Sequence, residues 1–124
     1  MNIEEIWKNF KQLEMEEDDA ICLDDTKECE LLSNNIIGLS LFNNISIDVQ
    51  QQENKDMYYL VVYVDVEDMG DEVDTNNVSF IMNILMLPHY IDYDGDNEIW
   101  KFPIGNKSEI EQKIKEINEK IKNR

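Results

Sequence analysis

The 124-residue sequence contains few of the residues that characterise disulfide scaffolds, membrane spans or secreted proteins. Its two cysteines, Cys22 and Cys29, have a spacing that fits neither a disulfide framework nor a paired zinc site. The longest apolar run, residues 78–87, is too short to cross a bilayer. The N-terminus lacks the positive region and apolar core of a secretory signal. We therefore expect reduced thiols and a cytoplasmic location.

Basic residues are also scarce, with 11 Lys and Arg against 28 Asp and Glu and a formal net charge of −17. Nucleic-acid affinity comes mainly from Lys and Arg that displace counterions, and anionic membranes attract the same residues. We therefore expect no direct contact with nucleic acid or membrane. Leu, Ile, Val and Phe make up about 29% of the chain, well above the roughly 20% below which disorder is expected. This content predicts one compact domain over residues 1–124.

The first half of the sequence predicts one helix and several strands. Residues 2–16 repeat apolar side chains at helical spacing, namely Ile3, Ile6, Trp7, Phe10 and Leu13. A short strand is predicted over residues 20–23. Residues 36–49 alternate between apolar and polar positions around Asn43-Asn44, which predicts a hairpin. Residues 57–66 are rich in Tyr and Val and apolar on both faces, which is typical of a central strand.

The second half predicts a helix, a hairpin and a closing helix. Residues 78–87 favour a buried helix that ends at Pro88 and is capped by Asn76 or Asn77, with a buried strand as the alternative. Residues 89–93 and 98–102 flank an Asp-Gly-Asp-Asn sequence that predicts a hairpin turn.

The closing helix is predicted from three features. Ser108 and Glu111 have the spacing of a capping box, isoleucines form one apolar stripe, and Glu precedes Lys by four residues three times. The stripe consists of Ile110, Ile114, Ile117 and Ile121, and the charge pairs are Glu109/Lys113, Glu111/Lys115 and Glu116/Lys120. The whole sequence therefore predicts a single α+β domain with an antiparallel sheet of about five strands and N-terminal, middle and C-terminal helices, in the order α-β-β-β-α-β-β-α.

The negative charge is unevenly distributed along the chain. Residues 1–100 sum to about −20 and residues 101–124 to about +3, and no Lys or Arg lies between Lys55 and Lys101. The acids form three clusters, in residues 14–30, 65–74 and 92–98. Because such crowding destabilises the compact state by self-repulsion, we interpret the clusters as a binding surface for a basic protein. A solubility coat is the alternative interpretation.

The candidate partner-binding residues come from these clusters and from two aromatic residues beside the third cluster. Aromatic anchors surrounded by carboxylates are typical of a surface that binds a basic protein, although ordinary sheet packing also explains aromatic residues there. The candidates are Glu16, Glu17, Asp18, Asp19, Asp65, Glu67, Asp68, Asp71, Glu72, Asp74, Asp92, Asp94, Asp96, Glu98, Tyr93 and Trp100.

No motif in the sequence indicates catalysis, a metal or a cofactor. Residues 92–99 resemble the start of an EF-hand calcium loop, but Asn97 replaces its glycine and Pro103 its bidentate glutamate. Weak binding of divalent cations by these carboxylates stays open. His89 is the only histidine, and both cysteines lie in an acidic neighbourhood that disfavours a reactive thiolate. We expect a non-enzymatic protein without cofactor, and a small hydrolase is a distant alternative.

In size and acidity the chain resembles the anti-restriction and anti-CRISPR proteins of phages and the immunity proteins of bacterial nuclease toxins. This resemblance implies a protein that binds and inhibits a basic nucleic-acid-acting protein, such as a nuclease, by placing carboxylates where phosphates would lie. The predicted element order is similar to that of dimeric type III secretion chaperones. That second resemblance implies a protein-binding homodimer with the helix of residues 78–87 at its interface.

Overall fold

The computed structural model describes residues 22–37, 44–65, 72–85, 89–95 and 97–123. The predicted helix over residues 2–16 lies outside them. The described elements are β1 (Leu23–Asp24), α2 (Lys27–Asn34), β2 (Ile45–Gln52), β3 (Tyr58–Asp65), α3 (Glu72–Leu85), β4 (Tyr90–Asp94), β5 (Asn97–Gly105) and α4 (Lys107–Lys122).

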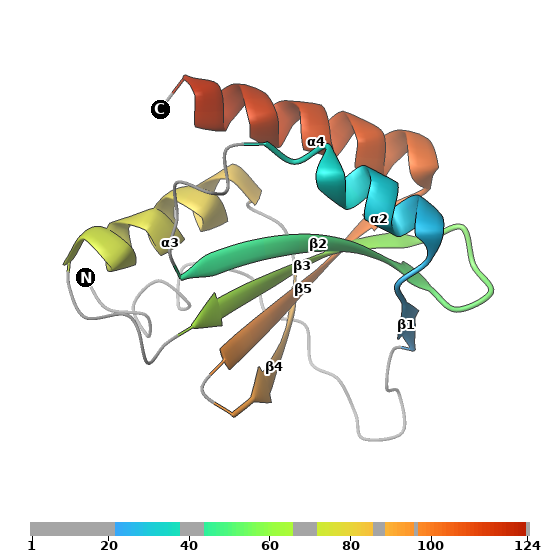
Figure 1. Cartoon of the computed structure of the whole chain (residues 1–124), viewed down its shortest axis with the longest axis horizontal. Coiled ribbons are helices and arrows are strands. Elements are labelled where there is room, and N and C mark those ends of the chain that lie inside the picture. The colour runs from blue at the N-terminus through green and yellow to red at the C-terminus, as the bar shows by residue number, and fades with distance from the viewer. Residues whose placement is uncertain (1–21, 38–43, 66–71, 86–88, 96, 124) are drawn as a thin grey trace.

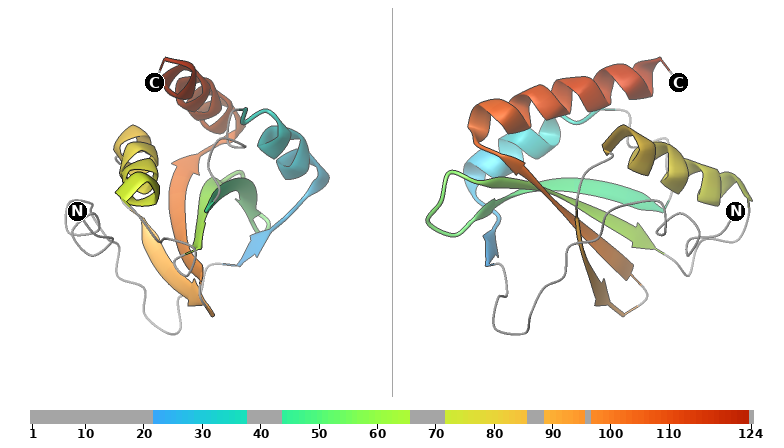
Figure 2. Two further views of the ribbon diagram at one scale, coloured as in Figure 1. Left: turned by 60° about the vertical axis from the view of Figure 1, so that its left-hand side comes forward. Right: turned by 180° about the vertical axis from the view of Figure 1, so that it is seen from behind.

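The strands form one antiparallel five-stranded sheet in the order β1-β2-β3-β5-β4. The helices α2, α3 and α4 lie over one face of this sheet (Figure 1), and the two further views in Figure 2 show the same layering. The predicted α+β class is confirmed, with three strands before the middle helix and two after it. β3 lies at the centre of the sheet, as its apolar residues on both faces predicted.

The helix α2 was not predicted. Thr26 caps it by accepting a hydrogen bond from the backbone N–H of Cys29, and Cys29 and Leu32 turn toward the core. Ser33 fastens α2 to the sheet, because its hydroxyl accepts the N–H of Val49 at 2.8 Å. Ile36 and Ile37 follow α2 outside any strand, so the prediction of a hairpin strand beginning there is wrong. Residues 38–43 lie outside the described residues, and β2 forms its hairpin with β3.

The core lies between the helices and one face of the sheet. Alternate residues of the long strands point into it, because successive side chains of a strand face opposite sides. The strands contribute Ile45, Ile47, Val49, Leu60, Val62, Val64, Trp100 and Phe102, and the two long helices contribute Val78, Ile81, Met82, Leu85, Ile110, Ile114, Ile117 and Ile121. The predicted isoleucine stripe of the closing helix is therefore confirmed.

The middle helix α3 confirms the predicted helix over residues 78–85 but begins earlier, at Glu72. The predicted end at residues 86–88 lies outside the described residues. Asn76 and Asn77 lie within it, so the prediction that one of them caps the helix is wrong. Val78, Ile81 and Met82 are buried in the core of the same chain. These side chains are consequently not available for the dimer interface that the chaperone resemblance implied.

The predicted hairpin of β4 and β5 is confirmed. Asp94 pairs with Asn97, so the two strands are joined by a two-residue turn. Its first residue, Gly95, has a φ of 61°, a left-handed conformation that glycine adopts without a steric penalty. Beyond the turn, Glu98, Trp100 and Phe102 are buried while their neighbours are half-buried.

The closing helix α4 begins two residues earlier than its predicted cap implies. Asn106 accepts the N–H of Glu109 at 3.0 Å, and Glu109 Oε1 accepts the N–H of Asn106 at 3.2 Å. The predicted capping box of Ser108 and Glu111 is therefore wrong, because the chain leaves β5 at Gly105 and turns directly into the helix. A Cβ at Gly105 would lie 2.5 Å from Glu109 Cδ, so this capping box requires the glycine.

The capping box gives a first test. We expect Asn106→Ala to lower the free energy of unfolding by about 1 kcal/mol, because the N–H of Glu109 loses its acceptor. Ser108→Ala serves as the matched control on the same exposed turn and should change stability by less than about 0.5 kcal/mol. Urea denaturation followed by circular dichroism measures both, and equal effects would contradict the observed cap.

Candidate functional site

Charge is unevenly distributed across the fold. The elements β3, α3 and β4 contain no Lys or Arg, whereas α4 carries five lysines beside four glutamates and is nearly neutral. The helix α4 and the turn between β4 and β5 lie on opposite sides of the molecule (Figure 1). The acidic side includes what we call the hairpin end of the sheet, which we define by Asp65, Asp92, Tyr93, Asn97 and Glu98.

The register of the strands brings two of the three acidic clusters together at the hairpin end. Asp65 of β3 pairs with Asn97 of β5, which pairs with Asp94 of β4. Asp65 and Asp92 occupy alternate positions to the core residues Val64 and Ile91, so both lie on the sheet face away from the helices. Residues that are 27 positions apart in the sequence thus contribute carboxylates to one surface.

Asp92 is the best-defined exposed carboxylate of this surface, with 54% of its side chain exposed. Its Oδ1 accepts the backbone N–H of Tyr93 at 2.8 Å, and its Oδ2 lies 3.4 Å from Lys101 Nζ. Because the Tyr93 N–H is bonded to Asp92, it is not available to pair with a strand of another molecule. This contact protects β4, which is an edge strand, from unwanted strand pairing. The second contact is a surface ion pair, a type that contributes little to stability.

Glu98 is buried, with 9% of its surface exposed, and this corrects its prediction as a surface carboxylate. The cause is the alternation of β5, which turns Glu98 to the same face as Trp100 and opposite Val64 of β3. Its Oε2 has no hydrogen-bond partner among the described residues. Burial raises the pKa of the Glu98 carboxyl from 4.5 to about 7, and the neighbouring Trp100 indole opposes that rise.

Trp100 is fully buried, so its prediction as an exposed anchor is also wrong. Its ring stacks on the buried His89, with centroids 5.3 Å apart, and His89 in turn contacts Phe102. These three rings belong to the core. Tyr93, by contrast, is 62% exposed and remains a candidate anchor.

The other predicted site residues are only partly described. For three of them, Glu72, Asp74 and Asp94, the structure describes the backbone in α3 and β4. Eight others lie outside the described residues, namely Glu16, Glu17, Asp18, Asp19, Glu67, Asp68, Asp71 and Asp96.

Within the described ranges, no group of three or more His, Cys, Asp or Glu is arranged to hold a metal ion. No helix in those ranges is long and apolar enough to span a membrane.

A second surface, which the sequence did not predict, is the groove between α2 and α4. It encloses about 520 Å³ and has Leu32 and Ile114 among its lining residues. Polar bridges connect the two helices at both ends of this α2–α4 groove, namely Lys107 Nζ to Glu28 Oε1 at 2.6 Å and Asn118 Nδ2 to Asn35 O at 2.7 Å. The sequence does contain a signal for α2, one wall of this groove, because Thr26 is followed by Cys29, Leu32 and Ile36 at helical spacing.

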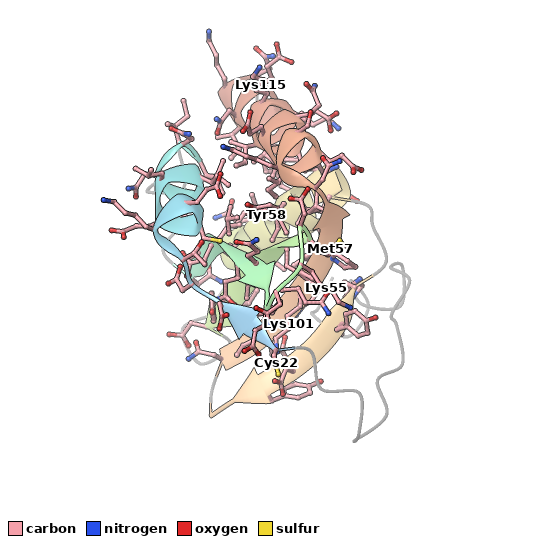
Figure 3. All side chains as sticks on the ribbon, turned by 90° about the vertical axis from the view of Figure 1, so that its right-hand side faces the viewer. Cys22, Lys55, Met57, Tyr58, Lys101 and Lys115 are labelled. Atoms are coloured by element: carbon pink, nitrogen blue, oxygen red, sulfur yellow. The ribbon has the colours of Figure 1, made fainter. Side chains whose placement is uncertain are left out.

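The first of these bridges includes a buried tyrosine of the sheet. Tyr58, which lies between the two helices in Figure 3, donates its hydroxyl to Glu28 Oε2 at 3.0 Å. Burial, and then the Glu28 carboxylate, raise the pKa of Tyr58 to about 12. Lys107, and then Tyr58, lower the pKa of Glu28. This network holds the N-terminal ends of α2 and α4 together.

Two large apolar side chains are exposed near the α2–α4 groove. Leu31 lines it and is 59% exposed, and Ile37, which is 61% exposed, donates its N–H to Asn118 Oδ1 at 2.9 Å.

No protein-family model, curated protein or solved structure matches the chain. The two surfaces are therefore interpreted from their own residues.

The buried carboxyl of Glu98 gives a second test. Its folded-state pKa of about 7 exceeds the ordinary 4.5, so its contribution to stability is complete below pH 4.5 and is lost as the pH rises through 7. We expect a loss of about 3 kcal/mol over that range. The Glu98→Gln side chain stays neutral at every pH and does not suffer this loss. The free energy of unfolding of the variant, measured by urea denaturation, should therefore rise relative to that of the wild type as the pH increases. A difference independent of pH would contradict this account.

Proposed function

We propose that this chain is a non-enzymatic acidic protein that binds and inhibits a basic nucleic-acid-acting protein, such as a nuclease. The observation that carries the proposal is the uneven distribution of charge, with carboxylates at the hairpin end and a nearly balanced set of five lysines and four glutamates on the opposite α4. A uniform solubility coat requires no such uneven distribution. The proposed partner surface is the positively charged groove in which the partner ordinarily holds phosphates.

The physical basis is electrostatic complementarity on a rigid scaffold. Each acid at the hairpin end lies on a strand that is hydrogen-bonded to its neighbours, so its backbone position is fixed before binding and little backbone entropy is lost. Opposite potentials accelerate association and become less effective as salt screens them. The net charge of −17 repels nucleic acid, so this protein and nucleic acid do not bind each other. We expect them to compete for the phosphate-binding groove of the partner.

The proposed location is the cytoplasm, where nucleases of this kind meet their substrates. Both cysteines are free thiols in the structure, with Cys22 exposed and Cys29 buried. Free thiols are the usual state of cysteine in a reducing compartment.

Affinity capture from the native host, followed by mass spectrometry, identifies the partner. We expect a basic nucleic-acid-binding protein whose complex dissociates as salt is raised above about 0.15 M. Nucleic acid added in excess should displace the chain. Capture of non-basic partners alone would refute the proposed function.

With the partner in hand, neutralising two acids tests the surface. Asp65→Asn/Asp92→Asn should weaken the complex about tenfold or more at low salt, because both carboxylates lie at the hairpin end. The control Glu116→Gln/Glu119→Gln removes the same charge from exposed positions on α4 and should change affinity less than about twofold. Calorimetric titration measures both, and equal losses would show that only net charge matters.

A chaperone-like dimer is the second candidate function, and the exposed Leu31 and Ile37 beside the α2–α4 groove favour it. Exposed apolar pairs beside a groove are typical of protein-binding surfaces. For this candidate, light scattering at micromolar concentration should give about twice the monomer mass of 14.7 kDa. Leu31→Asp should then give a monomer, whereas Tyr93→Asp at the hairpin end should leave the dimer intact. A monomeric wild type would remove this candidate.

A further inference from the structure

We propose that the hairpin of β4 and β5 receives an arginine side chain of the basic partner, whose guanidinium pairs with the Glu98 carboxylate and lies against the Tyr93 ring. This inference rests on the proposed function and names the residue type that the partner must supply. It assigns the two residues different roles, a recessed anion and an exposed aromatic surface.

The geometry of the two residues follows from the strand register. Tyr93 of β4 pairs directly with Glu98 of β5, so both side chains project from the same face of the sheet. Directly opposite residues in an antiparallel pair have Cβ atoms about 5 Å apart. Tyr93 is 62% exposed, whereas Glu98 is 9% exposed and its Oε2 is shielded from solvent. The carboxylate must therefore turn outward beside the Tyr93 ring to pair with an entering guanidinium.

Among the described residues the Glu98 carboxyl has no cationic partner, and the neutral Trp100 indole is the group that favours its ionised form. Its Oε2 has no hydrogen bond within the described part of the chain, and an uncompensated buried carboxylate is costly. The raised pKa of Glu98 is the consequence of that cost. Lys101 on the same strand does not supply the charge, because it lies on the opposite face and pairs with Asp92.

The groups around Glu98 define what can bind there. Across the strands it faces Tyr93 on β4 and Val64 on β3, and along its own face it neighbours Trp100. Tyr93 is the titratable group among these, and Glu98 raises the pKa of its hydroxyl after burial does. A cation is therefore the complementary ligand for this pair.

Arginine fits this pair better than lysine does. Its guanidinium is planar, forms two parallel hydrogen bonds with a carboxylate, and is more weakly hydrated than an ammonium group. The same plane stacks on an aromatic ring and gains a cation–π contribution. Lysine offers a strongly hydrated point charge that loses more hydration on entering a recessed site.

The test uses the full chain and two probes of equal charge, an oligoarginine and an oligolysine peptide of the same length. We expect wild type to bind oligoarginine more tightly and Glu98→Gln to weaken that binding about tenfold. Glu53→Gln is the matched control, because it removes one exposed acid from the turn between β2 and β3 at the other end of β3. It should change the affinity less than about twofold.

Protonation provides a second readout that a merely structural role would not produce. Arginine binds the ionised form of Glu98, so wild-type affinity for oligoarginine should fall about tenfold between about pH 8 and pH 6. Glu98→Gln should show no such fall. Carbon-13 NMR of the Glu98 carboxyl should show its pKa dropping on addition of the peptide. Tyr93→Leu should weaken binding several-fold, and Tyr93→Phe should restore it.

Different outcomes separate this inference from the proposed function. Equal affinities for the two peptides, equal losses in Glu98→Gln and Glu53→Gln, or an unchanged Glu98 pKa would each overturn the arginine site while leaving the acidic binding surface in place. The identity of the native partner tests the proposed function independently of these peptides. Thermal unfolding confirms that each variant is folded before binding is measured.

Discussion

The alternation of side chains along β5 is the constraint on which the core and the hairpin end both depend. Every second residue from Glu98 to Phe102 must face the helices, because Trp100 and Phe102 fill the space under them. A shift of one residue would expose both rings and bury Lys101 and Ile99 instead. This register also turns Glu98 inward. The burial that raises the pKa of Glu98 is therefore a consequence of the packing of Trp100 and Phe102, which lie two and four residues further along β5.

The acidic side and the nearly neutral side of the molecule arise from the same layered architecture. The helix α4 carries its five lysines and four glutamates outside the core because its isoleucines occupy the inside, so acids and bases nearly balance there. The strands β3 and β4 lack basic residues altogether, and their carboxylates collect where the two strands end beside β5. Folding thus converts a charge asymmetry along the sequence into an asymmetry between opposite surfaces.

Local periodicity predicted most of the described fold but not its exceptions. The β4–β5 hairpin, the helix α3 and the isoleucine stripe of α4 all have patterns that depend on near neighbours. The short helix α2 escaped prediction because its eight residues are held by Thr26, Ser33 and contacts with distant elements. At the candidate site, Tyr93 was predicted to be exposed and is, whereas Glu98 and Trp100 were misassigned because burial depends on the sheet register, which the sequence did not show.

The bridge from Asn118 to Asn35 joins residues that are 83 positions apart. A helix as short as α2 is marginal in isolation, and the bridges that fix it to α4 involve residues from Lys107 onward. During synthesis, the ribosome therefore releases nearly the entire chain before α2 can gain this support. A nascent chain that stalls before α4 has emerged would lack a wall of the α2–α4 groove and part of the cover over its core.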